Sequence, residues 1–318
     1  MLIAWLKFAL YSIAIFLSGY ISCKYGSLIA KKSRISEGFM GVFFLALATS
    51  APELLTSVIA VKSKIFDLAL GNIFGSLLSN LFILILLDLC VSKGGFLRKS
   101  KNFKGIFIIL ILQALIAVSI ILRSFAGFDL DIFSFGLENI FIVILYLIFL
   151  KGEIRDGQAD IVSSKSSNDK GCLKEWAVFI IALIAMAFFA QLTVIQSKII
   201  VERSMLNYVF FGTLFLGVIT SLPELVVTVS ALMNRSHAMA IGNIIGSNAL
   251  DIAIIPILEI VSFKVPIFSK MSSSHLYTLV AVEIVTVVLF VLLRFRKLNR
   301  AYELMLLLLL VVPLIIIF

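Results

Sequence analysis

Residues 39–54 read FMGVFFLALATSAPEL, and residues 210–225 read FFGTLFLGVITSLPEL. A second pair of motifs follows at the same spacing, because residues 71–76 read GNIFGS and residues 242–247 read GNIIGS. The offset between the two copies is 171 residues throughout, and 17 of the 38 aligned positions are identical. Shared apolar composition does not place two polar motifs at one common offset. The chain therefore contains an internal repeat.

The composition is that of a protein that crosses a membrane many times. Of the 318 residues, 61% are hydrophobic and 14% are charged, against about 25% charged in an ordinary soluble domain. The mean hydropathy is +1.15. Apolar runs of about 20 residues, the length that a bilayer-spanning helix needs, recur along the chain. Soluble and disordered proteins are excluded, and so are outer-membrane barrels, whose strands alternate polar and apolar residues.

These runs predict an all-α polytopic membrane protein with ten transmembrane helices in a 5+5 inverted-topology repeat. Two five-helix halves are expected at residues 1–150 and 176–318, joined by a cytoplasmic linker at 151–175. The predicted spans are 2–23, 38–61, 66–91, 105–122, 131–150, 176–196, 207–232, 238–262, 275–293 and 301–318.

The repeat copies are inverted relative to each other. The second and third spans match the seventh and eighth, so five spans separate the copies, and an odd number reverses the direction of crossing. Inverted repeats are a signature of secondary transporters, which bind substrate near the bilayer midplane between the repeats. An enzyme has no general need of this symmetry.

The polar linkers orient the chain. With the N-terminus outside, the cytoplasmic linkers carry 19 Lys and Arg residues and the external linkers carry 7. This asymmetry follows the positive-inside rule, so we expect both termini outside and the loop 151–174 in the cytoplasm. The basic loops account for the net charge of +9 without a nucleic-acid partner. We expect a multi-pass protein of a prokaryotic plasma (inner) membrane.

A glutamate lies near the middle of each motif-bearing span, Glu53 in the first copy and Glu224 in the second. A carboxylate at bilayer depth costs at least ~2.5 kcal/mol, which makes an intramembrane acid a functional candidate. Inversion of the copies is expected to bring the two acids together at the midplane. Two close carboxylates either share a proton or hold a cation.

The residues around the glutamates favour a cation. Pro52 and Pro223 each remove a helical N–H and displace the carbonyl one turn earlier. Such carbonyls are tolerated in a membrane only where they are buried in protein or line a cavity. Hydroxyl side chains one turn before each glutamate share its face. They are Thr49, Ser50, Thr220 and Ser221.

The second motif adds further oxygen ligands and a means of close packing. Ser76 and Asn80 lie one turn apart, as do Ser247 and Asp251. The Gly-x-x-x-Gly spacing in both copies allows close helix approach. The candidate set contains carboxylate, hydroxyl, amide and carbonyl oxygens, with no Cys or His. Hard cations such as Ca²⁺, which takes 6–8 oxygen ligands, prefer such a set.

The two motif pairs resemble the alpha repeats of the calcium/cation antiporter superfamily, and are most similar to its prokaryotic sodium/calcium exchanger branch. The resemblance covers nearly the whole chain. It implies that Glu53 and Glu224 are the central Ca²⁺ ligands, with the backbone oxygens of Thr49 and Thr220. The middle of the site would be completed by Asn80 and Asp251.

The same resemblance implies two flanking Na⁺ sites. One would be lined by Ser50, Ser76 and the Ala46 carbonyl. The other would be lined by Ser221, Ser247 and the Gly217 carbonyl. The chain departs from the family pattern where Gly usually precedes Thr-Ser and where Asn usually follows Gly-Ser. The residues at these places are Ala48, Ile219 and Leu77.

We therefore predict a secondary antiporter, not an enzyme, that exchanges Ca²⁺ against Na⁺ by alternating access and needs no cofactor. Its partners are the two ions and the lipid bilayer. A proton-coupled or K⁺-dependent antiporter of Ca²⁺ or another divalent cation is the alternative. An intramembrane enzyme with paired acids is a remote one, because its chemistry needs neither inverted duplication nor flanking hydroxyls.

Overall fold

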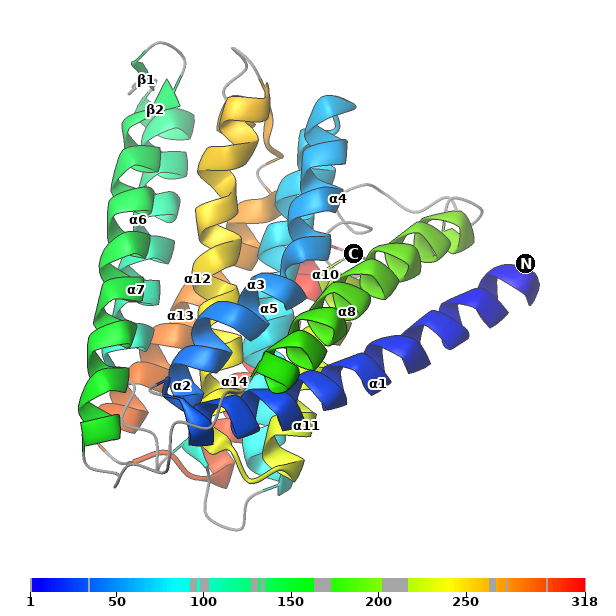
Figure 1. The fold of residues 1–318 in the computed structure, drawn as a ribbon. Helices are drawn as coiled ribbons and strands as arrows, with labels where there is room; N and C mark the ends of the chain where they lie inside the picture. Colours follow the sequence, from blue (N-terminus) through cyan, green and yellow to red (C-terminus); the bar gives the residue numbers. More distant parts are fainter. Residues whose placement is uncertain are drawn as a thin grey trace. The chain divides into compact units, whose positions relative to one another are not determined.

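The computed structural model describes residues 2–33, 35–91, 96–97, 103–126, 131–132, 135–162, 173–201, 217–262, 267–272, 274–295 and 297–317. Within these residues the chain is almost entirely helical, as the sequence predicts (Figure 1). The elements are α1 (Leu2–Lys32), α2 (Glu37–Phe39), the π-helix η1 (Met40–Leu45), α3 (Ala46–Thr49), α4 (Ala51–Lys62), α5 (Phe66–Val91), α6 (Phe103–Ala126), β1 (Asp131–Ile132), β2 (Phe135–Gly136), α7 (Leu137–Val162), α8 (Leu173–Val201), α10 (Gly217–Thr220), α11 (Leu222–Met233), α12 (His237–Ser262), the 3₁₀ helix η4 (Ile267–Lys270), α13 (Ser274–Arg294) and α14 (Arg300–Ile317).

Each predicted span overlaps helix in the described residues. Among those residues, six helices are long and apolar enough to cross a membrane. The fold is therefore that of an all-α polytopic membrane protein. The spans that carry the GNIxGS motifs, α5 and α12, have the largest buried shares of these six. The first part of the seventh predicted span, residues 207–216, lies outside the described residues.

The start of the fifth span needs correction. We predicted helix from residue 131, but β1 and β2 form a short antiparallel pair there, with Asp131 opposite Gly136 and Ile132 opposite Phe135. Glycine is a poor helix former, and α7 begins directly after Gly136. Helices also extend into the predicted linker, because α7 continues to Val162 and α8 begins at Leu173.

The chain divides into two compact units, and each draws on both sequence halves. Unit 1 comprises Met1–Pro52, Ile148–Ser204 and Ile219–Ser247. Unit 2 comprises Glu53–Leu147, Met205–Val218 and Asn248–Phe318. The chain passes from one unit to the other inside the repeat motifs, directly before Glu53 and directly after Ser247.

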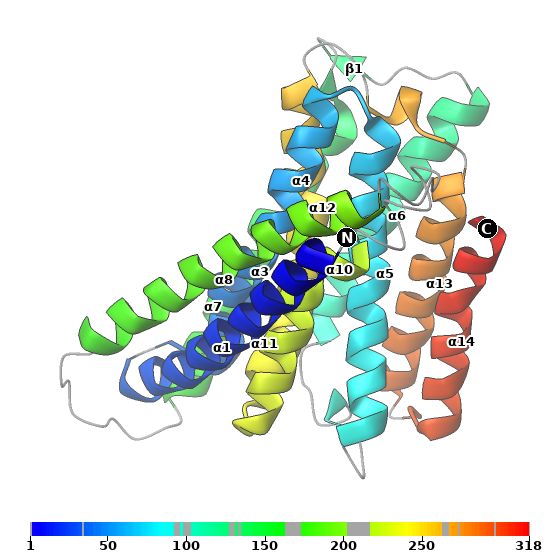
Figure 2. The same cartoon turned by 90° about the vertical axis from the view of Figure 1, so that its right-hand side faces the viewer.

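Unit 1 contains α1 and α8 side by side, and α1 also packs against α11 (Figure 2). Its tightest helix contact involves the glycines of the second GNIxGS motif. A methyl group on Gly242 would lie 2.6 Å from the carbonyl oxygen of Gly38, and one on Gly246 would collide with the Val42 carbonyl. Only glycine permits this approach, so the predicted packing role of Gly242 and Gly246 is confirmed.

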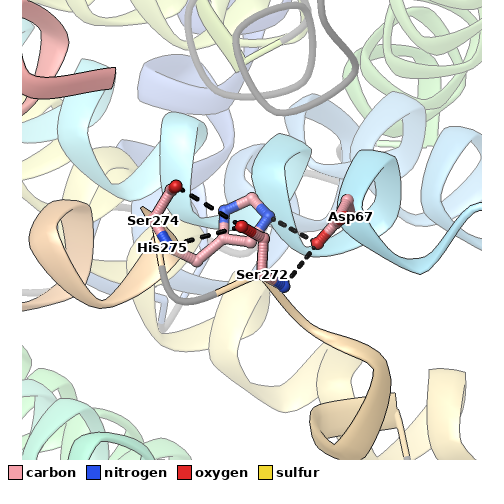
Figure 3. A network of polar contacts seen from close by, with 4 residues as sticks. All are labelled: Asp67, Ser272, Ser274 and His275. Atoms are coloured by element: carbon pink, nitrogen blue, oxygen red, sulfur yellow. Dashed lines mark hydrogen bonds and ion pairs between the residues drawn. The ribbon is translucent and has the colours of Figure 1, made fainter.

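In unit 2, α5 packs against α13 and α14, and α13 also contacts α6. A polar network joins the first turns of α5 and α13 (Figure 3). The Asp67 carboxylate accepts the backbone N–H of Ser272 at 2.7 Å and lies 3.3 Å from Nε2 of the buried His275. The His275 ring also meets the edge of Phe74, with centroids 5.9 Å apart. These contacts hold the helix that carries Ser76 and Asn80 in place.

Candidate cation-binding site

Both motif-bearing segments are interrupted at equivalent serines. Ser50 separates α3 from α4 with φ −82° and ψ 2°, and Ser221 separates α10 from α11 with φ −81° and ψ 5°. Each break precedes a proline by two residues. Proline has no N–H to bond the carbonyl one turn earlier, so the helical hydrogen-bond ladder cannot run through this point. The predicted distortion around Pro52 and Pro223 is thus confirmed.

The interruptions place each glutamate in the first turn of a new helix. Glu53 lies in the first turn of α4, and Glu224 in the first turn of α11. Both side chains are fully buried. The positive end of a helix dipole stabilises a carboxylate in this position, and a broken helix with such an end is typical of transporter binding sites.

In unit 1, hydroxyl groups surround the Glu224 carboxylate. Its Oε1 lies 3.4 Å from Oγ of Ser50 and 3.2 Å from Oγ of Ser247, and both hydroxyls donate to it. The Ser247 hydroxyl also lies 3.1 Å from Oγ1 of Thr49. Thr49 donates in turn to the Ala46 carbonyl at 3.2 Å. Five of the predicted ligand residues therefore form one connected cluster, which joins residues of both repeat copies.

In unit 2, the Ser76 hydroxyl donates to Oε1 of Glu53 at 3.3 Å. The Asn80 amide nitrogen lies 3.5 Å from Oδ2 of Asp251. Asn80 and Asp251 occupy equivalent positions of the two copies, since they are 171 residues apart. This contact therefore joins the two repeat copies within unit 2.

The remaining candidates also lie in the described residues. Gly217 belongs to unit 2, where a methyl group on it would come within 2.6 Å of the Gly75 backbone and 3.0 Å of the Ser76 nitrogen. The resemblance assigns the Gly217 carbonyl to the site of Ser221 and Ser247, and this assignment stays a prediction. The hydroxyl residues at the second break are buried in unit 1. They are Thr220 and Ser221.

Several buried oxygens lack the donors that a purely structural site would provide. Among the described residues, no group donates a hydrogen bond to Oε2 of Glu224 or to Oδ1 of Asn80. A buried acceptor left without a partner costs about 1–3 kcal/mol. Within the described part of the chain, no group of three or more His, Cys, Asp or Glu side chains lies close enough together to hold a metal ion. The oxygens around Glu224 come from one carboxylate and from hydroxyl groups, which are ligands that hard cations prefer.

Sequence reasoning missed two asparagines that support the glutamates. The Asn72 amide donates to the Glu53 carbonyl at 3.3 Å, and the Asn243 amide donates to the Glu224 carbonyl at 3.5 Å. Both asparagines are fully buried. The sequence marks both asparagines, because each is the second residue of a GNIxGS motif. Only the structure shows that each asparagine bonds the glutamate carbonyl.

The residues that depart from the family pattern make no polar contribution. Leu77 is fully buried in the core beside Ser76, whereas Ala48 and Ile219 are half-buried next to the helix breaks. Their apolar side chains fill space and leave the hydroxyl, amide and carboxylate groups of both clusters in place.

A family model described as sodium/calcium exchanger protein matches residues 3–152 and 174–318. An uncharacterized membrane protein of Methanocaldococcus jannaschii is 28% identical over 245 residues, which cover 74% of this chain and 77% of that protein. The sodium/calcium exchanger MaX1 of Methanosarcina acetivorans is 25% identical over 268 residues, covering 73% of this chain and 75% of that protein.

A solved structure shares the fold over nearly its full length. The sodium-calcium exchanger NCX_Mj, soaked with 10 mM Na⁺ and no Ca²⁺, matches with a TM-score of 0.73. The match covers 98% of both chains at 24% sequence identity. The all-helical exchanger fold predicted from the repeat is thereby confirmed.

Proposed function

Because the chain belongs to the sodium/calcium exchanger family, we propose that it exchanges Ca²⁺ for Na⁺ across a membrane through its two motif glutamates. The observation that carries this proposal is the environment of Glu224. Two serine hydroxyls hold one carboxylate oxygen, while the other accepts no hydrogen bond from the described residues. Buried carboxylate oxygens are usually hydrogen-bonded, so this oxygen of Glu224 is a candidate ligand for a cation.

The charge of the site explains how the transport of Ca²⁺ is coupled to that of Na⁺. Glu53 and Glu224 together carry about two negative charges, and burying such charges without counter-ions is costly. One Ca²⁺ or two Na⁺ neutralise them. Since the same oxygens serve either load, the ions compete, and the loaded protein changes the side to which the site opens more readily than the empty one. Competition together with alternating access gives antiport.

The hydroxyl and amide ligands distinguish this site from a proton relay. Thr49, Ser50 and Ser247 surround one acid, and Ser76 contacts the other. A proton needs no such cage, whereas a dehydrated Na⁺ or Ca²⁺ requires several oxygens. We propose that the remaining candidates Ala46, Thr220, Ser221, Gly217, Asn80 and Asp251 complete the coordination, as the family resemblance implies.

We propose that both termini lie outside and that the loop between α7 and α8 is cytoplasmic, in a plasma (inner) membrane. The distribution of Lys and Arg supports this orientation. In that setting the Na⁺ gradient and the membrane potential drive Ca²⁺ outward. A C-terminal alkaline phosphatase fusion, active only outside the cytoplasm, is expected to be active. An inactive fusion there and an active one in the central loop would reverse the assignment.

The test is Ca²⁺ uptake into liposomes that carry the purified protein. Liposomes are loaded with Na⁺, K⁺ or choline, and a separate set carries a pH gradient. Uptake is expected only with internal Na⁺, and is expected to vanish in Glu53→Gln and Glu224→Gln. The matched control is Glu283→Gln, which removes a glutamate of α13 outside the motifs and should transport like wild type.

The alternatives predict different results in the same experiment. Uptake driven only by the pH gradient would identify a proton-coupled exchanger, and uptake that requires K⁺ together with Na⁺ would identify a K⁺-dependent one. Normal transport by Glu53→Gln would overturn the two-glutamate site.

A further inference from the structure

We propose that Asn72 and Asn243 are positioning residues, each of which holds the helical turn that presents one motif glutamate to the ion. This inference rests on the proposed function, because it assigns the glutamates as ligands. It adds two residues that touch no ion. They act through the backbone to which Glu53 and Glu224 are attached.

The contact in unit 2 is a clasp between two helices. One amide nitrogen of Asn72, on α5, donates to the Glu53 carbonyl at 3.3 Å and to the Ser57 hydroxyl at 3.0 Å. Ser57 follows Glu53 by one turn of α4, and its hydroxyl donates back to the Ala69 carbonyl of α5 at 3.3 Å. The turn of α4 between Glu53 and Ser57 is thus bonded to α5 at both of its ends.

The contact in unit 1 repeats this arrangement. The Asn243 nitrogen, on α12, lies 3.5 Å from the Glu224 carbonyl and 3.3 Å from Oγ1 of Thr228, which follows Glu224 by one turn of α11. These side chains are fully buried. The two clasps belong to different units with different neighbours, yet in both the asparagine nitrogen bonds the glutamate carbonyl and the hydroxyl one turn later. A packing accident in one unit would not recur at the equivalent atoms of the other.

The chemistry explains why an amide occupies this position. A carboxamide nitrogen carries two protons and bonds two acceptors at once, whereas a hydroxyl has one proton and an ionised carboxylate has none. The clasped turn directly follows a helix break, so the hydrogen bond from the asparagine adds a fixed point where the helical ladder of α4 or α11 has just begun. In a buried site such a hydrogen bond is stronger than in water.

The expected effect is on ion affinity. Residues that orient a metal ligand without touching the metal change affinity about 10–100-fold when they are replaced. We expect Asn72→Asp and Asn243→Asp, which keep the side-chain shape but remove both donors, to weaken apparent Ca²⁺ affinity by about tenfold. Ser57→Ala and Thr228→Val remove one acceptor and leave the glutamate carbonyl bonded, so a smaller loss is expected.

The experiment measures Ca²⁺-dependent stabilisation of the purified full chain in detergent. The rise in Tm with Ca²⁺ concentration reports affinity, because a ligand stabilises according to its concentration relative to Kd. A merely structural role lowers the Ca²⁺-free Tm and leaves the concentration dependence unchanged. Positioning shifts the concentration dependence to higher Ca²⁺. Flux measurements on the same variants should show a raised KM with a smaller change in maximal rate.

Two controls separate the clasp from general damage. Gln113→Ala removes another fully buried carboxamide, on α6, and Thr56→Val removes a buried hydroxyl next to Ser57. Both should keep wild-type Ca²⁺ affinity. If the Asp variants do not fold, Ser57→Ala and Thr228→Val provide the test. Wild-type Ca²⁺ affinity in both of these variants would overturn the inference. Wild-type affinity in a folded Asn72→Asp would do the same while the proposed function stands. A wild-type protein that Ca²⁺ does not stabilise would instead overturn the proposed function and the inference together.

Discussion

The two glutamate clusters differ in chemistry although their motifs are nearly identical. In unit 1, Glu224 is surrounded by the hydroxyls of Ser50 and Ser247, with Thr49 bonded to Ser247. In unit 2, the contacts to Ser76 and between Asn80 and Asp251 bring a second acid and an amide into the set. The unit 1 cluster is rich in hydroxyls and has a single acid. The unit 2 cluster, as the term is used below, comprises two separate contacts, Glu53 with Ser76 and Asp251 with Asn80, and so contains two acids.

This difference bears on ion preference. A monovalent ion needs little charge compensation, and neutral hydroxyls with one carboxylate are sufficient for it. A divalent ion gains more from each additional carboxylate, because ligand charge sets Ca²⁺ affinity. The comparison therefore predicts that Na⁺ depends more on the unit 1 cluster and Ca²⁺ more on the unit 2 cluster. Substitutions at paired positions separate the two.

The largest effect is expected from the glutamates themselves. Glu53→Gln and Glu224→Gln each remove a buried charge and should reduce Na⁺-driven Ca²⁺ uptake by at least 100-fold, because several kcal/mol of ion interaction is lost. Uptake into Na⁺-loaded liposomes measures both variants. If one of them kept a tenth of the wild-type rate, the two clusters would not be equally necessary, and the two-charge account would fail.

The next largest effect is expected from exchanging the residues at positions 80 and 251, which moves a carboxylate from one position to the other. Asp251→Asn removes one acid from unit 2 and is expected to weaken Ca²⁺ affinity about tenfold, with a smaller effect on Na⁺. The double variant Asn80→Asp/Asp251→Asn restores the charge at the equivalent position 3.5 Å away. It should recover affinity to within about threefold if ligand charge rather than residue identity sets it.

The control for this exchange is Asn80→Asp alone, which adds a charge without removing one. Measuring Ca²⁺ and Na⁺ dependence of uptake for all three variants tests additivity. Failure of the double variant to improve on Asp251→Asn would show that the two positions are not equivalent, despite their symmetry in the sequence.

Sequence reasoning reached the helical fold because it follows from local chemistry. The GNIxGS spacing predicted the tight contacts of Gly242 and Gly246, and the prolines predicted a distorted helix in the segments that break at Ser50 and Ser221. Each of these effects acts within one turn of the residue that causes it, or depends only on the absence of a side chain.

Partners across helices were not predictable in the same way. The hydrogen bond from Ser50 to Glu224 of the other copy, for example, could not be predicted from the sequence. Apolar periodicity gives no register between helices that are distant in sequence. The π-helix η1 was also missed. Its residue Val42 lies directly against Gly242 and Gly246, a contact between distant segments that local propensity does not report.

Among the serines, Ser247→Ala is expected to have a larger effect than Ser76→Ala. The Ser247 hydroxyl donates to Glu224 and lies 3.1 Å from Oγ1 of Thr49, so its removal disturbs two neighbours in the unit 1 cluster. At about 1 kcal/mol per hydrogen bond, the concentration of Na⁺ for half-maximal uptake should rise about fivefold or more. The control is Ser79→Ala, on α5. Thr228→Val is unsuitable as a control because Thr228 is bonded to Asn243. Equal effects on Na⁺ and Ca²⁺ would contradict the division between clusters.

The smallest effect is expected from a substitution at Asp67, in the polar network of unit 2 that lies away from the proposed ligands. Asp67→Asn keeps an acceptor for the Ser272 N–H but removes the carboxylate charge that lies 3.3 Å from Nε2 of His275 (Figure 3). The expected loss is about 1 kcal/mol of unfolding free energy, or a fall in Tm of about 2–4 °C. The Ca²⁺ concentration dependence of the Tm should not move, because Asp67 lies more than two turns before Ser76 on α5. An unchanged Tm with weakened Ca²⁺ affinity would mean that the first turn of α5 sets the geometry of the ligands further along the helix, and that the unit 2 cluster extends beyond its acids and amide.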